Sequence, residues 1–127
     1  MKKLIFLLFL VPLFVGCEDD INAPESILGN WESVKTDHYQ NNVLTSSRIL
    51  SIDELFTFNF SSDGKLTYSD NTGRLENHTY KVSGNVIKVT NKSGITGSHT
   101  YEFRGDTLRW STRVGDSAFN VISFVKN

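Results

Sequence analysis

The chain has 127 residues, of which 39% are hydrophobic and 21% charged, with a formal net charge of −1 and a single cysteine. This length suits one small domain. The balanced charge without a basic patch argues against a nucleic-acid partner, and one cysteine excludes an intramolecular disulfide.

The amino-terminal residues have the pattern of a secretory signal. Two lysines follow the first methionine, residues 4–15 are almost wholly apolar, and Gly16 is a small residue directly before Cys17. A positive start, a short apolar run and a small-residue exit are typical of a signal peptide. The run is too short for a spanning helix, which needs about 20 apolar residues. We therefore expect residues 1–16 to be a signal peptide.

Cys17 gives this signal a more specific meaning. The stretch Phe14-Val15-Gly16-Cys17 resembles the lipobox of bacterial lipoproteins. The resemblance implies cleavage before Cys17, a diacylglycerol thioether on its sulfur and an acylated amino terminus. Each buried methylene of such chains contributes ~0.8 kcal/mol, and more than one chain makes the membrane anchor stable. The alternatives are a plain secretory signal cut nearby or a buried free cysteine.

Residues 17–26 are polar, include Pro24 and predict a flexible tether after the lipidated residue. The acidic run Glu18-Asp19-Asp20 resembles the export signal of surface-exposed lipoproteins in some Gram-negative phyla. A charge run of this kind is equally typical of a solvated linker. The resemblance implies a protein that is lipid-anchored in the outer membrane of a Gram-negative bacterium, facing either the periplasm or the cell surface.

The chain after residue 53 alternates apolar and polar side chains with period two, which indicates β-strands. Glycine-containing turn sequences separate the runs. The predicted loops are residues 91–98 and 114–119. The predicted strands cover residues 54–60, 65–69, 78–83, 86–90, 99–104, 107–113 and 120–126.

The pattern before residue 53 is weaker. Residues 31–36 predict a strand, residues 37–42 a polar loop, and residues 43–52 either a strand or a short helix. Short strands with repeated turn chemistry favour a β-barrel or a β-sandwich. About eight strands is the number that closes a small barrel. We therefore predict an all-β fold over residues 27–127, a small antiparallel up-and-down β-barrel.

Two short motifs point to a family. Gly29-Asn30-Trp31 resembles the G-x-W signature of lipocalins, and residues 58–66 and 101–108 resemble strand pairs of the small lipocalin-like domains attached to many bacterial lipoproteins. The resemblance covers residues 27–127. It implies that Trp31 plugs one end of the barrel and that the basic side chain of Lys126 packs over it.

The sequence offers little for catalysis. An enzyme needs polar groups that converge in a pocket, and Cys17, if lipidated, cannot be a nucleophile. The chain has no nucleophile-elbow, zinc-protease or phosphate-loop motif. Its three histidines are not at metal-ligand spacing. We therefore predict a non-catalytic protein without a metal or cofactor.

Aromatic side chains are the main candidates for function. They recur at strand period, so they should share the inner face of the barrel, where they either line a cavity for one small apolar ligand or fill the interior. For so short a chain, filling is favoured. The candidate cavity-lining residues are Phe56, Phe58, Tyr68, Tyr80, Tyr101 and Trp110.

These observations leave two functions open. The first is a membrane-anchored lipocalin-like lipoprotein that binds a small apolar molecule or a partner protein. The alternative is a structural or assembly lipoprotein of the envelope, with a filled barrel and no small-molecule ligand. An internal cavity favours the first function, whereas a filled core with an exposed apolar patch favours the second.

Overall fold

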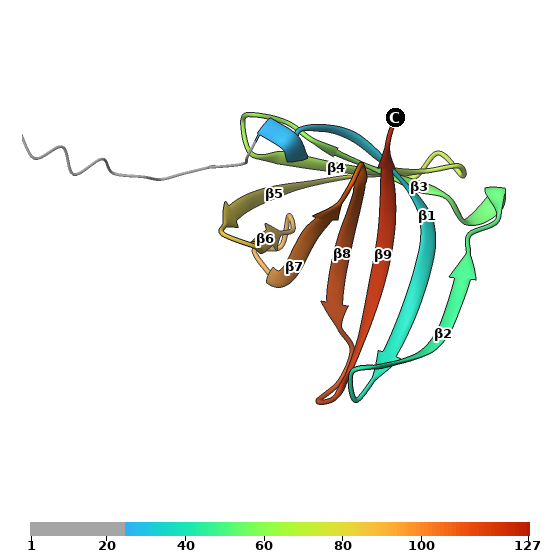
Figure 1. Ribbon diagram of the computed structural model, residues 1–127. Helices are drawn as coiled ribbons and strands as arrows, with labels where there is room; N and C mark the ends of the chain where they lie inside the picture. Colours follow the sequence, from blue (N-terminus) through green and yellow to red (C-terminus); the bar gives the residue numbers. More distant parts are fainter. Residues whose placement is uncertain (1–24) are drawn as a thin grey trace, which may run out of the picture.

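The structure is a computed structural model, and it describes residues 25–127 (Figure 1). The predicted signal peptide, Cys17 and most of the predicted tether lie outside these residues. The described elements are η1 (Glu25–Ile27), β1 (Gly29–Gln40), β2 (Val43–Ile49), η2 (Ile52–Glu54), β3 (Phe56–Phe60), β4 (Lys65–Asp70), β5 (Leu75–Ser83), β6 (Val86–Thr90), β7 (Thr96–Arg104), β8 (Thr107–Arg113) and β9 (Ala118–Lys126).

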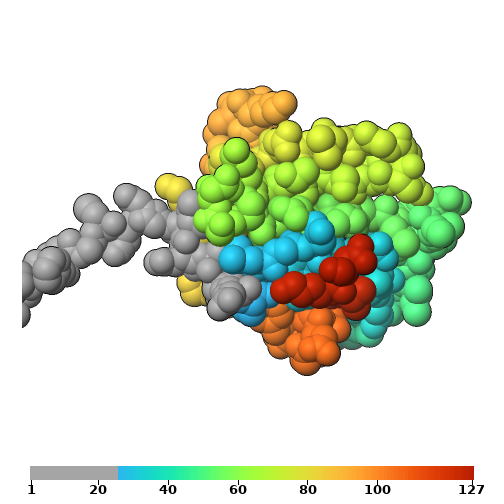
Figure 2. Space-filling view, turned by 90° about the horizontal axis from the view of Figure 1, so that it is seen from above, coloured from blue at the N-terminus to red at the C-terminus, as the bar shows by residue number. Residues whose placement is uncertain are grey.

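Eight of the nine strands form a closed antiparallel barrel, which confirms the predicted all-β fold. From β3 to β9, each strand pairs with the next along the chain. β1 pairs with β3 through residues 29–32 and closes the ring by pairing with β9 from Trp31↔Lys126 to Gln40↔Ala118. Figure 2 shows this closure from above, with the red carboxyl-terminal residues against the blue β1.

β2 is an additional strand outside the ring. It pairs with residues 35–40 of β1 and, within the part of the chain that the structure describes, with no other strand. All seven of its side chains are exposed. β8, β9, β1 and β2 continue together beyond β7, whose pairing with β8 ends at Thr100↔Ser111 (Figure 1). We call this four-stranded extension the tongue.

Several boundaries differ from the sequence prediction. Residues 37–40, predicted as loop, belong to β1 because strands on both sides pair with their backbone. Residues 43–49 form a strand rather than a helix. β7 begins at Thr96, inside the predicted loop, since its first residues pair with β6 although they carry no apolar pattern. The predicted tether ends earlier than residue 26, because Glu25–Ile27 form a 3-10 turn.

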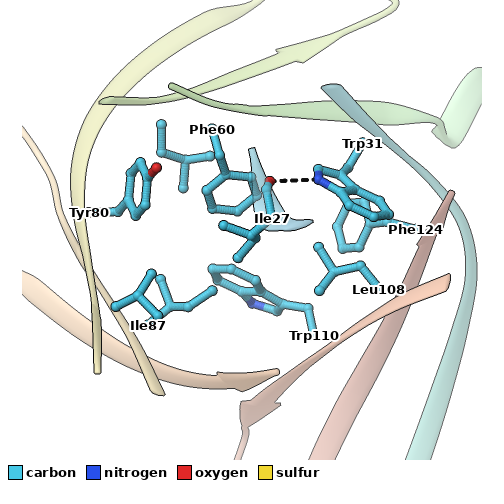
Figure 3. Close-up of a cluster of buried hydrophobic side chains, with 10 residues drawn as sticks. Ile27, Trp31, Phe60, Tyr80, Ile87, Leu108, Trp110 and Phe124 are labelled. Carbon is cyan, nitrogen blue, oxygen red and sulfur yellow. Dashed lines mark hydrogen bonds between the residues drawn. The ribbon is translucent and has the colours of Figure 1, made fainter. Parts of the chain in front are cut away.

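The core lies inside the ring (Figure 3). Its side chains come from η1 and from the inward positions of the strands, as period-two alternation requires. Burying each large apolar side chain contributes about 1.5–3 kcal/mol, so this set is large enough to specify the fold. The buried members are Ile27, Trp31, Phe60, Leu66, Tyr80, Val82, Ile87, Leu108, Trp110 and Phe124.

Among residues 25–127, no helix has the length and apolar character needed to cross a membrane.

Candidate functional site

Trp31 and Lys126 lie together where the chain enters the barrel. The Trp31 side chain is 3% exposed, and its Nε1 donates a hydrogen bond of 2.8 Å to the carbonyl oxygen of Ile27 (Figure 3). Lys126 Nζ lies 5.4 Å from the centre of the Trp31 ring, within the range of a cation–π contact. Gly29 has a φ of 113°, and a Cβ there would lie 3.2 Å from Lys126 Cε. A glycine at this position therefore allows the lysine to approach the tryptophan.

The six candidate cavity-lining residues come from β3, β4, β5, β7 and β8. Tyr80 and Trp110 are buried, and the other four are half-buried. Their aromatic rings pack against neighbouring aromatic rings. The ring centre of Phe58 lies 5.0 Å from that of Phe124 and 5.3 Å from that of Trp110, and the ring centres of Phe60 and Tyr80 are 5.1 Å apart. These are normal distances for packed aromatic pairs, so the rings occupy the space between them.

The tyrosine hydroxyls have partners within the protein. Tyr80 donates to the carbonyl oxygen of Ser61 at 2.6 Å and Tyr101 to that of Gly84 at 3.0 Å. Tyr68 donates to a carboxylate oxygen of Asp70 at 3.2 Å. Burial raises the pKa of all three phenols. The hydroxyls therefore anchor the rings, and they are already engaged without a ligand.

The three histidines occupy inward positions of β1, β5 and β7. His99 stacks on Trp110 at 4.8 Å and its Nδ1 lies 3.1 Å from Thr112 Oγ1, while burial lowers its pKa. His38 Nδ1 lies 2.6 Å from Asn120 Oδ1. His78 Nε2 lies 3.5 Å from a Glu76 oxygen. Within residues 25–127, no group of three His, Cys, Asp or Glu side chains could hold a metal ion.

Four of the large exposed apolar side chains lie on one segment, residues 43–52. Val43 and Leu44 of β2 are 62% and 49% exposed, and Ile49 and Ile52 are both 77% exposed. Arg48 and Glu54 form an ion pair of 2.5 Å beside them, and the hydrogen bond from Arg48 lowers the pKa of Glu54 to about 2. The sequence pattern does not predict this surface, because residues 43–52 fit a strand or a short helix equally well.

A second surface feature lies on the outer face of the tongue. Tyr39 of β1 stacks on Phe119 of β9, with centroids 4.8 Å apart and ring planes at 4°. The Tyr39 hydroxyl accepts a hydrogen bond of 3.3 Å from Arg109. Tyr39 and Phe119 lie in segments that the sequence pattern predicts as loops. The residues around Tyr39 in β1 are polar and show no apolar alternation, so the sequence carries no clear signal for this surface.

The barrel therefore has two kinds of candidate functional site. The interior contains packed aromatic rings, and the surface has the apolar strand β2 and the stacked pair of Tyr39 and Phe119. Cys17, the predicted lipidation site, lies outside the described residues. Comparisons of the chain with protein-family models, with curated proteins and with solved structures found no match.

Proposed function

We propose that this protein is a lipid-anchored, non-catalytic, lipocalin-like module of the bacterial envelope, which acts through its outer surface by binding another protein. The observation that carries the proposal is the packing of the inner aromatic rings against one another and against the buried core. A barrel of eight strands is just wide enough to be filled by its own side chains, and filling its interior removes the usual place for a small ligand.

The polar groups of the interior also support a function at the outer surface rather than a small-molecule site inside the barrel. A small-molecule site needs a few polar groups that are free to orient the ligand. Here the hydroxyls of Tyr80 and Tyr101 are bonded to backbone carbonyls, and His99 is bonded to Thr112 and stacked on Trp110. A ligand would have to replace these bonds. Among the described residues, the buried side-chain N or O atom without a partner is His78 Nδ1, and one such atom is fewer than the several polar groups that orient a ligand in its site.

β2 is the surface that best fits a partner protein. One edge of the strand pairs with β1, and the other has no strand partner among the described residues. An extended segment of another protein can add to such an edge through main-chain hydrogen bonds. Natural edge strands are commonly protected by charged side chains, especially lysine, or by proline. The one charged residue of β2, Arg48, is paired with Glu54, and the strand exposes Val43, Leu44 and Ile49.

Photo-cross-linking in living cells tests this function. A benzophenone amino acid at Leu44, on the free-edge strand, should give one discrete protein adduct. The Ile49→Lys substitution should abolish that adduct by placing a charge on the same strand. Thr79 is the matched control, because it is exposed on β5, whose two edges are paired with β4 and β6. Equal adducts from both positions, or none from Leu44, would refute the proposal.

A further inference from the structure

We propose that the outer face of β7, β8, β9 and β1, which extends from the barrel wall onto the tongue, binds an anionic saccharide chain. This inference goes beyond the proposed function, and Leu44 is the one residue of β2 that lines the surface described below. Successive side chains of a strand point to opposite faces of the sheet. Leu108 and Trp110 of β8 point into the core, so Arg109 and Ser111 point outward. On β9, Phe124 points inward and Phe119 shares the opposite face with Val121.

Three hollows adjoin one another on this face, with volumes of 310, 420 and 450 Å³. Each is within the range of about 300–1,000 Å³ that ligand sites have. Tyr39, Arg104 and Arg109 line both the first and the second. Thr100, Ser111 and Phe119 line both the first and the third. The three hollows therefore form one elongated groove, the outer groove, which fits a chain of repeated units.

The charge of the outer groove selects an anion. Its lining contains four cationic and two anionic side chains, a formal charge of +2, in a chain whose total is −1. A net excess of positive charge on a concave surface attracts ligands of the opposite sign. The cationic residues are Lys35, Arg104, Arg109 and Arg113; the anionic residues are Asp37 and Glu102.

Two arginines at the centre of the groove share one carboxylate partner, Glu102. Arg109 is 11% exposed and donates to a Glu102 oxygen at 3.0 Å and to the Tyr39 hydroxyl at 3.3 Å. Arg104 Nε lies 3.1 Å from the same Glu102 oxygen. One carboxylate thus supports two guanidinium groups, each with five N–H donors, so donors are left for a carboxylate or sulfate ligand. Arg109 is positioned in advance by its two partners, which lowers the entropy cost of binding.

The rest of the lining fits a sugar. Tyr39 and Phe119 stack beside the arginines, and Phe119 also lines the third hollow. The apolar C–H face of a pyranose packs on such flat rings, while Thr100 and Ser111 offer hydroxyls that can exchange hydrogen bonds with sugar hydroxyls.

A saccharide fits this face better than an acidic peptide does. The outer groove crosses β7, β8, β9 and β1, whose backbone groups are paired with one another here. A peptide lying across them would find no main-chain partners for its own N–H and C=O groups, and such unpaired groups are costly when desolvated. A saccharide has no peptide backbone, and its hydroxyls can use side-chain partners.

Calorimetric titration of the full chain in detergent micelles tests the inference, with oligogalacturonate as the probe. We expect saturable binding that weakens as salt is added. Oligoglutamate of equal charge tests charge alone, and neutral dextran oligomers test stacking alone; both should bind at least about tenfold more weakly. No binding of oligogalacturonate, or equal binding of oligoglutamate, would overturn the inference.

Variants locate the site. Phe119→Leu keeps an apolar side chain but removes the flat ring, and Arg104→Gln removes one charge; each should weaken oligogalacturonate binding about tenfold. Phe119→Tyr, which keeps the ring, should bind as the parent does. Arg74→Gln is the charge control, because Arg74 is an exposed arginine on the β4–β5 turn. An equal loss in Arg74→Gln, or undiminished binding in both groove variants, would place the ligand elsewhere and refute the proposal.

Discussion

Trp31 combines three contacts at one end of the barrel: core packing, a hydrogen bond to Ile27 and the nearby ammonium of Lys126. We expect Trp31→Ala to lower the free energy of unfolding by ~3–5 kcal/mol, as large aromatic truncations do. Trp31→Phe should lose only about 1 kcal/mol, because it keeps most of the packing and removes one hydrogen bond. Urea unfolding measures both; an alanine variant as stable as the parent would show that the ring does not support the core.

His99 makes stability depend on pH. Its pKa lies below the usual value of 6.5 because burial disfavours the charged ring. Below about pH 6.5 the unfolded chain therefore binds more protons than the folded one, and stability falls as the pH decreases. We expect the urea midpoint to drop between about pH 7 and pH 5, a window above most carboxylate titration. His99→Gln should reduce that drop, and an unchanged drop would assign it to other groups.

The aromatic residues show which side-chain positions can be predicted from the sequence and which cannot. The inner aromatic positions follow from period-two alternation, because each strand must turn one face to the core. Tyr39 and Phe119 escaped prediction because their neighbours are polar on both faces of the tongue, where the inner face is no longer wholly apolar. His38 illustrates this: it lies on the inner face of the tongue, with its Nδ1 2.6 Å from Asn120 Oδ1.

At the scale of elements, β2 is the least protected strand. It has one paired edge and no buried side chain, whereas β9 is paired along both edges and contributes Val121 and Phe124 to the buried residues. Local opening is easiest where backbone hydrogen bonds are exposed and buried contacts are few. We expect the β2 amides bonded to β1 to exchange with solvent at least about tenfold faster than those of β9. Equal protection in a hydrogen-exchange experiment would mean that β2 is covered.

β1 explains why element boundaries were harder to predict than the fold class. Its first four residues pair with β3 and its last six with β2, and a bulge between Ser33 and Lys35 separates the two halves. At this bulge, Ser33 is fully buried and its Oγ accepts a hydrogen bond of 3.0 Å from the Phe56 N–H. Such tertiary pairing extends the strand over polar residues that have little strand propensity of their own.

At the scale of the whole molecule, the predicted membrane anchor on Cys17 rests on the sequence alone. Replacing Cys17 with Ser removes the sulfur that would carry the lipid, so the protein should lose palmitate labelling and leave the membrane fraction. Fractionation of cells that express each form measures this. A Cys17→Ser protein that is still labelled with palmitate and sediments with membranes would show that the lipid is attached elsewhere.

The central claim is that the barrel is filled and the protein acts through its outside. The most direct measurement is the titration of an apolar fluorescent probe into the domain that begins at Asn22. We predict no saturable binding, because the inner rings contact one another and the tyrosine hydroxyls are engaged. Tight one-to-one binding that Trp110→Ala abolishes without loss of stability would contradict the claim and make the interior a ligand site.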